Sequence, residues 1–297
     1  MRTPAASLSG RLRAWWDGEP MPAQSGAIRA ARPAKDAAAR DDGTADPPDA
    51  RLDAMQMIFG EGFTGPGGAA AAVRLVEGLG LNASSNVLEI GAGLGGTTRA
   101  IAGHSGAYVT GLEFDPDMAR QACIQARRHQ LAKKASVEAL DPRTLSLRES
   151  RYRAVVVRHV LHRIAARRAF LLALAKSLQT GGRMVIYDVF LAPGSDPRAY
   201  TDWFGGLPAE VFAPDVDELA AEVKSIGLEI SAVQDLTERY CADLLEAWRG
   251  VPRTLAASRP PEVVAARIVA EAETWSRRLR LLEAGALGIH ALVGART

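Results

Sequence analysis

The sequence predicts an α/β protein built on a doubly wound, largely parallel sheet, and two observations carry that prediction. From about residue 67 onward, short apolar segments typical of buried strands alternate with segments of helical period. The first of those strands runs straight into a glycine-rich loop, and sheets of this kind bind ligands at the carboxyl ends of their strands. We therefore expect the loops after the first four strands to surround one crevice.

The predicted elements follow one another through short connections. Seven segments have strand character: 86–90, 107–112, 135–139, 154–157, 183–188, 228–233 and 285–293. Helices are predicted over 69–79, from Asp115 to about His129, from Phe170 to a stop at Gly181-Gly182, and over 238–283. Asp115-Pro116-Asp117 marks a helix start because it combines a capping side chain, a first-turn proline and acidic charge.

The first 50 residues differ in composition from the rest. They are rich in Ala, Arg, Pro, Asp and Gly, a composition that cannot bury enough apolar surface to offset ordering entropy. We expect residues 1–50 to be a mostly disordered tail and 51–297 to form the folded domain. Within the tail, residues 8–17 combine leucines and tryptophans with arginines. This segment either docks weakly to a membrane surface or a partner, or lies on the protein's own surface.

Bulk properties exclude several classes of protein. The formal net charge of the 297 residues is only +2, which argues against a general electrostatic grip on nucleic acid. Two distant cysteines, Cys123 and Cys241, are not a disulfide framework. No apolar run approaches the roughly 20 residues that span a bilayer, and the N-terminus lacks a secretory signal. We expect a cytoplasmic protein without a transmembrane segment or a nucleic-acid partner.

The strongest local signal is the loop Leu88-Glu-Ile-Gly-Ala-Gly-Leu-Gly-Gly96. Its glycines let the backbone turn tightly and approach a ligand closely, but Gly91, Gly93 and Gly96 also satisfy the dinucleotide fingerprint. Glu89 shifts the balance. A carboxylate two residues before the first glycine would attract the cationic methionine end of S-adenosylmethionine and repel a pyrophosphate.

Two more acidic residues stand at strand ends. Glu113 ends the second strand, where its carboxylate can accept hydrogen bonds from both ribose hydroxyls, a feature that dinucleotide folds share. Asp141 follows the third strand, within reach of the exocyclic amine of adenine. The predicted cofactor site also takes in the residues that follow these acids, Phe114 and Pro142.

These motifs resemble those of the class I S-adenosylmethionine-dependent methyltransferases, with Glu89-Ile-Gly-Ala-Gly as the first motif, Glu113 as the ribose acid and Asp141 as the adenine-side acid. The resemblance covers roughly residues 58–295. It implies a Rossmann-like, seven-stranded sheet whose last strand inserts antiparallel, with S-adenosyl-L-methionine as cofactor. It also implies that helical insertions at 191–215 and 238–283 build the acceptor pocket and form a lid.

A narrower resemblance lies ahead of the first motif. The segment Ile58-Phe-Gly-Glu-Gly-Phe-Thr-Gly-Pro-Gly-Gly68, here called the cover segment, resembles one that folds over the methionine end of the cofactor in phosphoethanolamine N-methyltransferases. That likeness implies cofactor contacts from Phe63, Thr64 and Gly65, and from Arg158 after the fourth strand. The tyrosines and arginine that hold the substrate phosphate in that family are not matched around Val189 and 205–211.

Three further residues are candidates on the acceptor side. His162 matches the family's catalytic histidine when one residue is gapped, and a neutral histidine there could take a proton from the acceptor. His159 either lines the cofactor pocket or is structural. Three-residue spacing places both on one helical face, but no nearby acid or cysteine completes a metal site, so no metal is predicted. Asp188, which ends the fifth strand, either binds a cationic group of the substrate or caps its loop.

The other conspicuous side chains have ordinary interpretations. Tyr200, Trp203 and Phe204 form either an aromatic lid or part of the core, and the arginines of 277–280 are expected on the outer face of a helix.

The function that the sequence favours is methyl transfer from S-adenosylmethionine to a nitrogen or oxygen of a small-molecule acceptor. Base-amine methyltransferases carry an Asn/Asp-Pro-Pro-aromatic segment where this chain has Arg158-His-Val-Leu-His162. Two alternatives stay open: a non-catalytic S-adenosylmethionine-binding or scaffold protein, since fold does not fix function, and an NAD-dependent oxidoreductase. The identity of the acceptor is not predicted.

Overall fold

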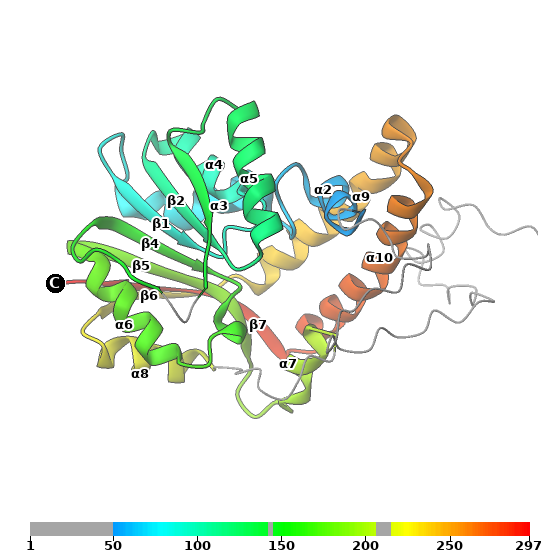
Figure 1. Cartoon of the computed structure of the whole chain (residues 1–297). Helices are drawn as coiled ribbons and strands as arrows, with labels where there is room; N and C mark the ends of the chain where they lie inside the picture. The colour runs from blue at the N-terminus through cyan, green and yellow to red at the C-terminus, as the bar shows by residue number, and fades with distance from the viewer. Residues whose placement is uncertain (1–49, 142–144, 206–214) are drawn as a thin grey trace, which may run out of the picture.

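The computed structural model describes residues 50–141, 145–205 and 215–297 (Figure 1). The predicted tail up to residue 49, the docking segment 8–17 and Pro142 lie outside those ranges. Within them, no helix combines the length and apolarity needed to cross a membrane.

A seven-stranded sheet forms the centre of the molecule. Its strands are β1 (Asn86–Ile90), β2 (Tyr108–Glu113), β3 (Ala135–Ala139), β4 (Tyr152–Arg158), β5 (Leu178–Leu191), β6 (Glu229–Asp235) and β7 (Leu287–Ala295). They are arranged in the order β3-β2-β1-β4-β5-β7-β6. The pairs from β3 to β5 are parallel, and β7 runs antiparallel to both β5 and β6. The predicted seven strands and the antiparallel insertion of the last one are confirmed.

The order of the strands fixes where a ligand can bind. From β1 the chain moves outward to β2 and β3, then returns to β4 on the other side of β1. The carboxyl ends of β1 and β4 therefore flank the point where the winding reverses, which is where open α/β sheets hold their ligands. Residues 87–90 of β1 and 154–157 of β4 are buried and, apart from Glu89, apolar, as expected of central parallel strands that are covered on both faces.

Helices cover both faces of the sheet (Figure 1). One face packs against α6 (Arg167–Ser177) and α8 (Val216–Ser225) through a core that includes Leu88, Leu171 and Leu219. The other packs against α3 (Gly68–Val76) with its 3-10 extension η1 (Glu77–Leu79), and against α4 (Gly96–Ser105). Helix α5 (Pro116–Arg128) packs beside β3, and the Asp115 carboxylate caps its start as predicted, accepting from the amides of Asp117 and Met118.

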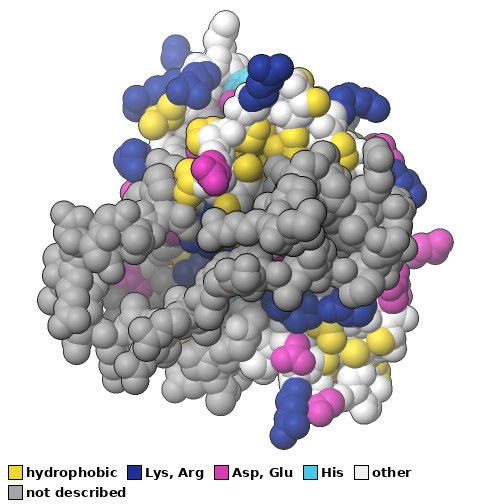
Figure 2. All heavy atoms as spheres, turned by 90° about the vertical axis from the view of Figure 1, so that its right-hand side faces the viewer, with side chains coloured by type: hydrophobic (Ala, Val, Ile, Leu, Met, Phe, Trp, Pro, Cys, Tyr) yellow, Lys and Arg dark blue, Asp and Glu magenta, His cyan; other side chains and the backbone are white. Residues whose placement is uncertain are grey.

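A separate helical unit stands beside the sheet, on the right of Figure 1. It consists of α2 (Ala50–Phe59), α7 (Arg198–Trp203), α9 (Thr237–Ser258) and α10 (Glu262–Glu283). It shares a core with β5 and β7 that is rich in aromatic side chains, among them Phe59, Trp203, Tyr240 and Trp275. Over the part of this face that is not grey in Figure 2, basic and acidic side chains are interspersed, in keeping with the small net charge.

One expectation about a helix is wrong, and another is refined. Helix α6 ends at Ser177 and not at Gly181-Gly182, because β5 begins at Leu178, opposite Tyr152 of β4. The helical stretch over 238–283 is two helices, since Arg259 adopts a left-handed conformation (φ 44°) and Pro260-Pro261 follows it.

Candidate functional site

A cleft of about 350 Å³ opens at the carboxyl ends of β1, β2 and β4. Its walls come from the cover segment, the glycine loop, the turn after β4, and helices α7, α9 and α10. A second cavity of about 430 Å³ lies at the ends of β2 and β3, lined by Phe114, Asp141 and Arg163, and Arg163 borders both spaces. Because they share Arg163, the two spaces adjoin, and they are together called the crevice here. Each has a volume typical of small-molecule sites, roughly 300–1,000 Å³.

The glycine loop after β1 follows a path that side chains would block. Gly91 has φ +84°, and a Cβ there would lie 2.3 Å from the carbonyl oxygen of Arg158 and 2.6 Å from Val160. Its amide donates to the carbonyl of Leu112 at 2.9 Å, which ties the loop to the end of β2. Gly91 and Gly93 both line the cleft, so the bare backbone faces whatever binds there.

Glu113 is held rigidly at the end of β2. One carboxylate oxygen accepts from the amide of Gly93 at 2.7 Å and the other from the amide of Asp115 at 3.0 Å. The side chain borders the cleft, and each carboxylate oxygen keeps further acceptor capacity for ligand hydroxyls. This arrangement fits a ribose diol.

Two of the residues predicted for the adenine side lie at the same cavity. Phe114 and Asp141 line the second cavity, and the Arg163 guanidinium lies 4.8 Å from the centre of the Phe114 ring. A flat ring beside a carboxylate suits a purine with an exocyclic amine. The predicted partner Pro142 is outside the described residues.

Glu89 does not lie where it was predicted to act. It is fully buried beneath the loop and does not line the cleft. Its carboxylate accepts from the hydroxyl of Thr98 at 2.7 Å and pairs with the Arg158 guanidinium at 3.3 Å. Burial raises the pKa of Glu89, opposed chiefly by the charge of Arg158. Glu89 therefore holds Arg158 and the start of α4, from a position beneath the residues that line the cleft.

Arg158 itself borders the cleft, as predicted. Its guanidinium bonds the Thr97 hydroxyl as well as Glu89, while its Nε atom is buried without a hydrogen-bond partner. A fixed cation with an unused donor next to the glycine loop suits a carboxylate, such as that of the methionine moiety.

The cover segment lies against the glycine loop. Phe63, Thr64 and Gly65 line the cleft at the positions that were predicted for cofactor contacts. The amide of Gly96 donates to the carbonyl of Gly62 at 3.0 Å. A Cβ on Gly96 would lie only 2.5 Å from that oxygen, so the approach requires glycine.

Asp188 is the second site residue that the structure places differently. Its carboxylate is fully buried and accepts from the backbone amides of Val160, Leu161 and Val189 at 2.8–3.0 Å. It does not line the cleft. Of the two predicted roles, this geometry supports the loop cap.

The turn that Asp188 fixes carries both histidines into the cleft. His159 has φ +50°, a left-handed conformation that costs a non-glycine residue of order 1 kcal/mol and is concentrated at functional sites. Its ring lies 4.9 Å from that of Tyr187, and its Nδ1 is 3.8 Å from the Asp188 carboxylate.

His162 lies in the 3-10 turn η3 (Leu161–Arg163) and stacks on Phe204 with ring centres 4.0 Å apart. Burial lowers its pKa to about 4, and its Nδ1 has no hydrogen-bond partner. The imidazole is therefore neutral at physiological pH, with a nitrogen free for a ligand. Among the described residues, no group of three His, Cys, Asp or Glu side chains is placed to hold a metal ion.

The acceptor side contains residues that the sequence did not reveal. Tyr240 and Trp275 are such residues, and they line it beside Trp203 and Phe204 of the predicted aromatic cluster. That cluster supplies both core and cleft wall. Arg278, expected on an outer helix face, points inward instead. Its guanidinium lies 5.1 Å from the Trp203 ring and 4.5 Å from the Trp275 ring, and its Nε donates to the Trp203 carbonyl. The signal available in the sequence was Trp275, three positions before Arg278 on α10, because residues three apart lie on the same face of a helix.

The charge that borders the cleft is mostly positive. Arg51, Arg158, Arg163 and Arg278 line it, whereas Glu113 is the acid among the described lining residues. Burial lowers the pKa of Arg278 from its ordinary value, but an arginine keeps its charge throughout the physiological range.

Comparison with known proteins defines the class. A protein-family model described as "Methyltransferase domain" matches residues 88–184, which span the glycine loop to the middle of β5. Together with the order of the strands, this match shows that the chain has the fold of the class I S-adenosylmethionine-dependent methyltransferases.

Within that class the chain resembles phosphoethanolamine N-methyltransferases in part. It is 24% identical over 191 residues to phosphoethanolamine N-methyltransferase 1 of Zea mays, covering 64% of this chain and 37% of that protein. It is 28% identical over 180 residues to a demethylmenaquinone methyltransferase of Tropheryma whipplei, covering 51% and 69%. A structure of Haemonchus contortus phosphoethanolamine N-methyltransferase 2 in complex with S-adenosyl-L-methionine superposes with a TM-score of 0.72 at 19% identity, over 82% of this chain and 56% of that one. The chain thus spans just over a third of the maize protein.

Proposed function

We propose that this chain transfers a methyl group from S-adenosylmethionine to a nitrogen or oxygen of a small-molecule acceptor. The observation that carries the proposal is the convergence of three strand ends on one crevice. The glycine loop after β1, the Glu113 carboxylate after β2 and the Phe114–Asp141 cavity border it together. These features suit, in order, the amino-acid end, the ribose and the adenine of the cofactor.

The chain's own residues would contribute alignment and the exclusion of water. S-adenosylmethionine supplies a sulfonium methyl that is already activated for displacement. The cover segment and the aromatic side chains of α7, α9 and α10 enclose the space beside the loop, which favours an in-line approach in a dry site. His162 is neutral and has an unpaired ring nitrogen, so it can accept a hydrogen bond from the acceptor's N–H or O–H. A pKa of about 4 makes it a weak base.

The lining of the acceptor side favours a small molecule that carries negative charge. Its arginines complement an anionic group, and phosphoethanolamine, named in the maize relative, is one molecule of that kind. The tyrosines and arginine that hold the substrate phosphate in phosphoethanolamine N-methyltransferases are not matched here. Arg278 would therefore have to bind the anionic group.

Calorimetric titration tests the cofactor. S-adenosylmethionine, S-adenosylhomocysteine and NADH are titrated into the wild type, Glu113→Ala and the control Glu138→Ala, whose exposed carboxylate on β3 lies outside the cleft. We expect affinities on the order of micromolar for the first two ligands, lost in Glu113→Ala and kept in the control. Binding of NADH alone would favour the oxidoreductase.

Turnover separates an enzyme from a scaffold. Release of S-adenosylhomocysteine is measured with a panel of amine, hydroxyl and phosphorylated acceptors, after subtraction of the rate without acceptor. Cofactor binding without release for any acceptor would support the non-catalytic alternative.

A further inference from the structure

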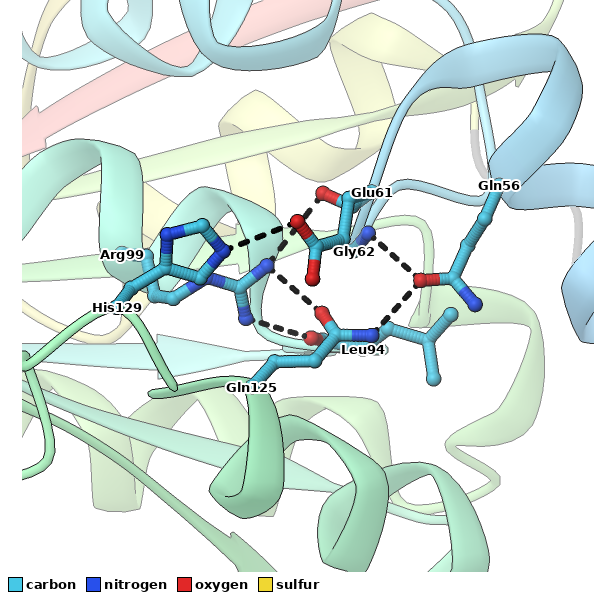
Figure 3. Close-up of polar contacts among 7 residues, drawn as sticks. All are labelled: Gln56, Glu61, Gly62, Leu94, Arg99, Gln125 and His129. Carbon is cyan, nitrogen blue, oxygen red and sulfur yellow. Dashed lines mark hydrogen bonds and ion pairs between the residues drawn. The ribbon is translucent and has the colours of Figure 1, made fainter. Parts of the chain in front are cut away.

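A cluster of polar side chains lies behind the glycine loop, outside the cleft (Figure 3). It joins α2, the cover segment, the glycine loop, α4 and α5 through Gln56, Glu61, Gly62, Leu94, Arg99, Gln125 and His129. Gly62 and Leu94 line the cleft, whereas Arg99, Gln125 and Gln56 do not. The cluster therefore reaches the cofactor side only through backbone.

Arg99 is at its centre and is 8% exposed. One guanidinium nitrogen donates to the carbonyl of Leu94 in the glycine loop at 3.0 Å. The other donates to the Gln125 side chain at 2.8 Å and, more weakly, to the carbonyl of Glu61 at 3.4 Å. These partners are neutral oxygens, so burying the cation has no carboxylate hydrogen-bonded to it in compensation. An apolar side chain would fill the space at lower desolvation cost, which indicates that the forked donors themselves are needed.

The direction of the remaining hydrogen bonds follows from Arg99. Because arginine only donates, the Gln125 oxygen must face it and the Gln125 amide nitrogen must face away. That nitrogen donates to the Gln56 oxygen at 2.7 Å, and the same oxygen accepts from the amide of Gly62 at 2.9 Å. Gly62 is thus held at its N–H by Gln56 and at its C=O by Gly96, directly before Phe63 and Thr64.

The edge of the cluster, formed by His129 and Glu61, is exposed to solvent, unlike its centre. His129 and Glu61 are 3.0 Å apart, but both side chains are about half exposed. An exposed pair of this sort contributes little. It therefore offers a matched control at the surface of the same cluster.

We propose that Arg99 is a positioning residue for the cofactor site, holding the cover segment on the glycine loop so that Phe63 and Thr64 face the methionine side. The proposal rests on the function proposed above. Arg99 hydrogen-bonds Leu94, Glu61 and Gln125, beside the part of the cleft that meets the amino-acid end of the ligand. The nucleoside side is formed by Glu113, Phe114 and Asp141.

A pair of ligands separates these two sides. S-adenosylhomocysteine has both the nucleoside and the amino-acid end, whereas methylthioadenosine has the nucleoside and thioether alone. We expect Arg99→Met to weaken S-adenosylhomocysteine about tenfold or more, with methylthioadenosine changed less than about twofold. Gln56→Leu, which breaks only the link to Gly62, should shift the same ratio in the same direction but less, and His129→Ala should leave it unchanged.

A ligand-free measurement accompanies the titrations. Amide hydrogen exchange in peptides that cover residues 60–65 should be faster in Arg99→Met and Gln56→Leu than in the wild type and His129→Ala. Equal losses of affinity for both ligands would overturn the proposal for Arg99. So would unchanged amide exchange over residues 60–65 in both Arg99→Met and Gln56→Leu. A wild type that binds neither ligand would instead overturn the proposed function, and the inference with it.

Discussion

The cofactor side and the acceptor side of the cleft are built in different ways. On the cofactor side, the backbone does most of the holding, through the amides of Gly91 and Gly93 bonded to the end of β2 about 20 residues along the chain. On the acceptor side, side chains from separate helices meet, and Arg278 donates to the carbonyl of Trp203 across 75 residues of sequence. The first side depends on local geometry, and the second depends on how the helical unit docks.

That difference explains why the two sides behave differently as targets for substitution. A change in the glycine loop has no room to be absorbed, because backbone lies against backbone. A change on the acceptor side alters what the pocket recognises and leaves the sheet intact. Three substitutions test this contrast.

The largest effect is expected for Gly91→Ala. The added Cβ would lie 2.3 Å from a backbone oxygen at a residue with φ +84°, so we expect the free energy of unfolding to fall by about 3 kcal/mol or more. Cofactor affinity should be lost as well. Urea denaturation measures the first and calorimetry the second.

Gly103→Ala is the matched control for that substitution. Gly103 lies in α4 with open space where its Cβ would be, so the change should stabilise the protein by up to about 1 kcal/mol. A Gly91→Ala protein as stable as the wild type would show that the glycine loop can move away from Arg158 and accommodate the added Cβ.

A smaller and more selective effect is expected for Arg278→Met. Loss of a charged donor should raise the KM for an anionic acceptor found by the panel about ten- to hundredfold, with the affinity for S-adenosylhomocysteine unchanged. Arg280→Met, on the same helix but exposed and bonded to Ser276, should change neither. If the two affinities fall together in Arg278→Met, the cleft is not divided as described.

The smallest effect concerns pH. The folded protein binds a proton at His162 less tightly than the unfolded chain does, with a pKa of about 4 against 6.5. The contribution of His162 to stability is therefore full above pH 6.5 and is lost as the pH falls toward 4. Between pH 7 and about 5.5, His162→Gln should lose less free energy of unfolding than the wild type, by about 1 kcal/mol. Parallel pH profiles would mean that the ring is more accessible than its stacking on Phe204 indicates.

The cofactor side was largely predictable from the sequence because its signals are local. The strands at 86–90 and 135–139 coincide with β1 and β3, and the positions assigned to Phe63, Gly91, Glu113 and Asp141 all border the crevice. The surroundings of Glu89 were not predicted. Strand residues alternate between faces, and its carboxylate meets Thr98 and the Arg158 guanidinium beneath the loop, contacts that no local pattern records.

The acceptor side was not predictable in the same way. The inward direction of Arg278 depends on α10 packing against α2 and α7, and helices α2 and α8 were not predicted at all. The stop assigned to Gly181-Gly182 failed because pairing with β4 extends β5 through that point. In each case a tertiary contact decided the outcome, and no local pattern records it.

The place of β7 has a consequence for how the molecule assembles. Strand β7 pairs with β5 on one side and with β6 on the other. The facing edges of β5 and β6 therefore stay unpaired until residues 287–295 have left the ribosome. Asp188, which caps the turn that carries the two histidines, lies opposite His290 in this pairing. We expect the glycine-loop half to form early, from contacts close in sequence, and the acceptor half to mature late. Nascent chains arrested before β7 would then bind nucleoside before they could recognise an acceptor.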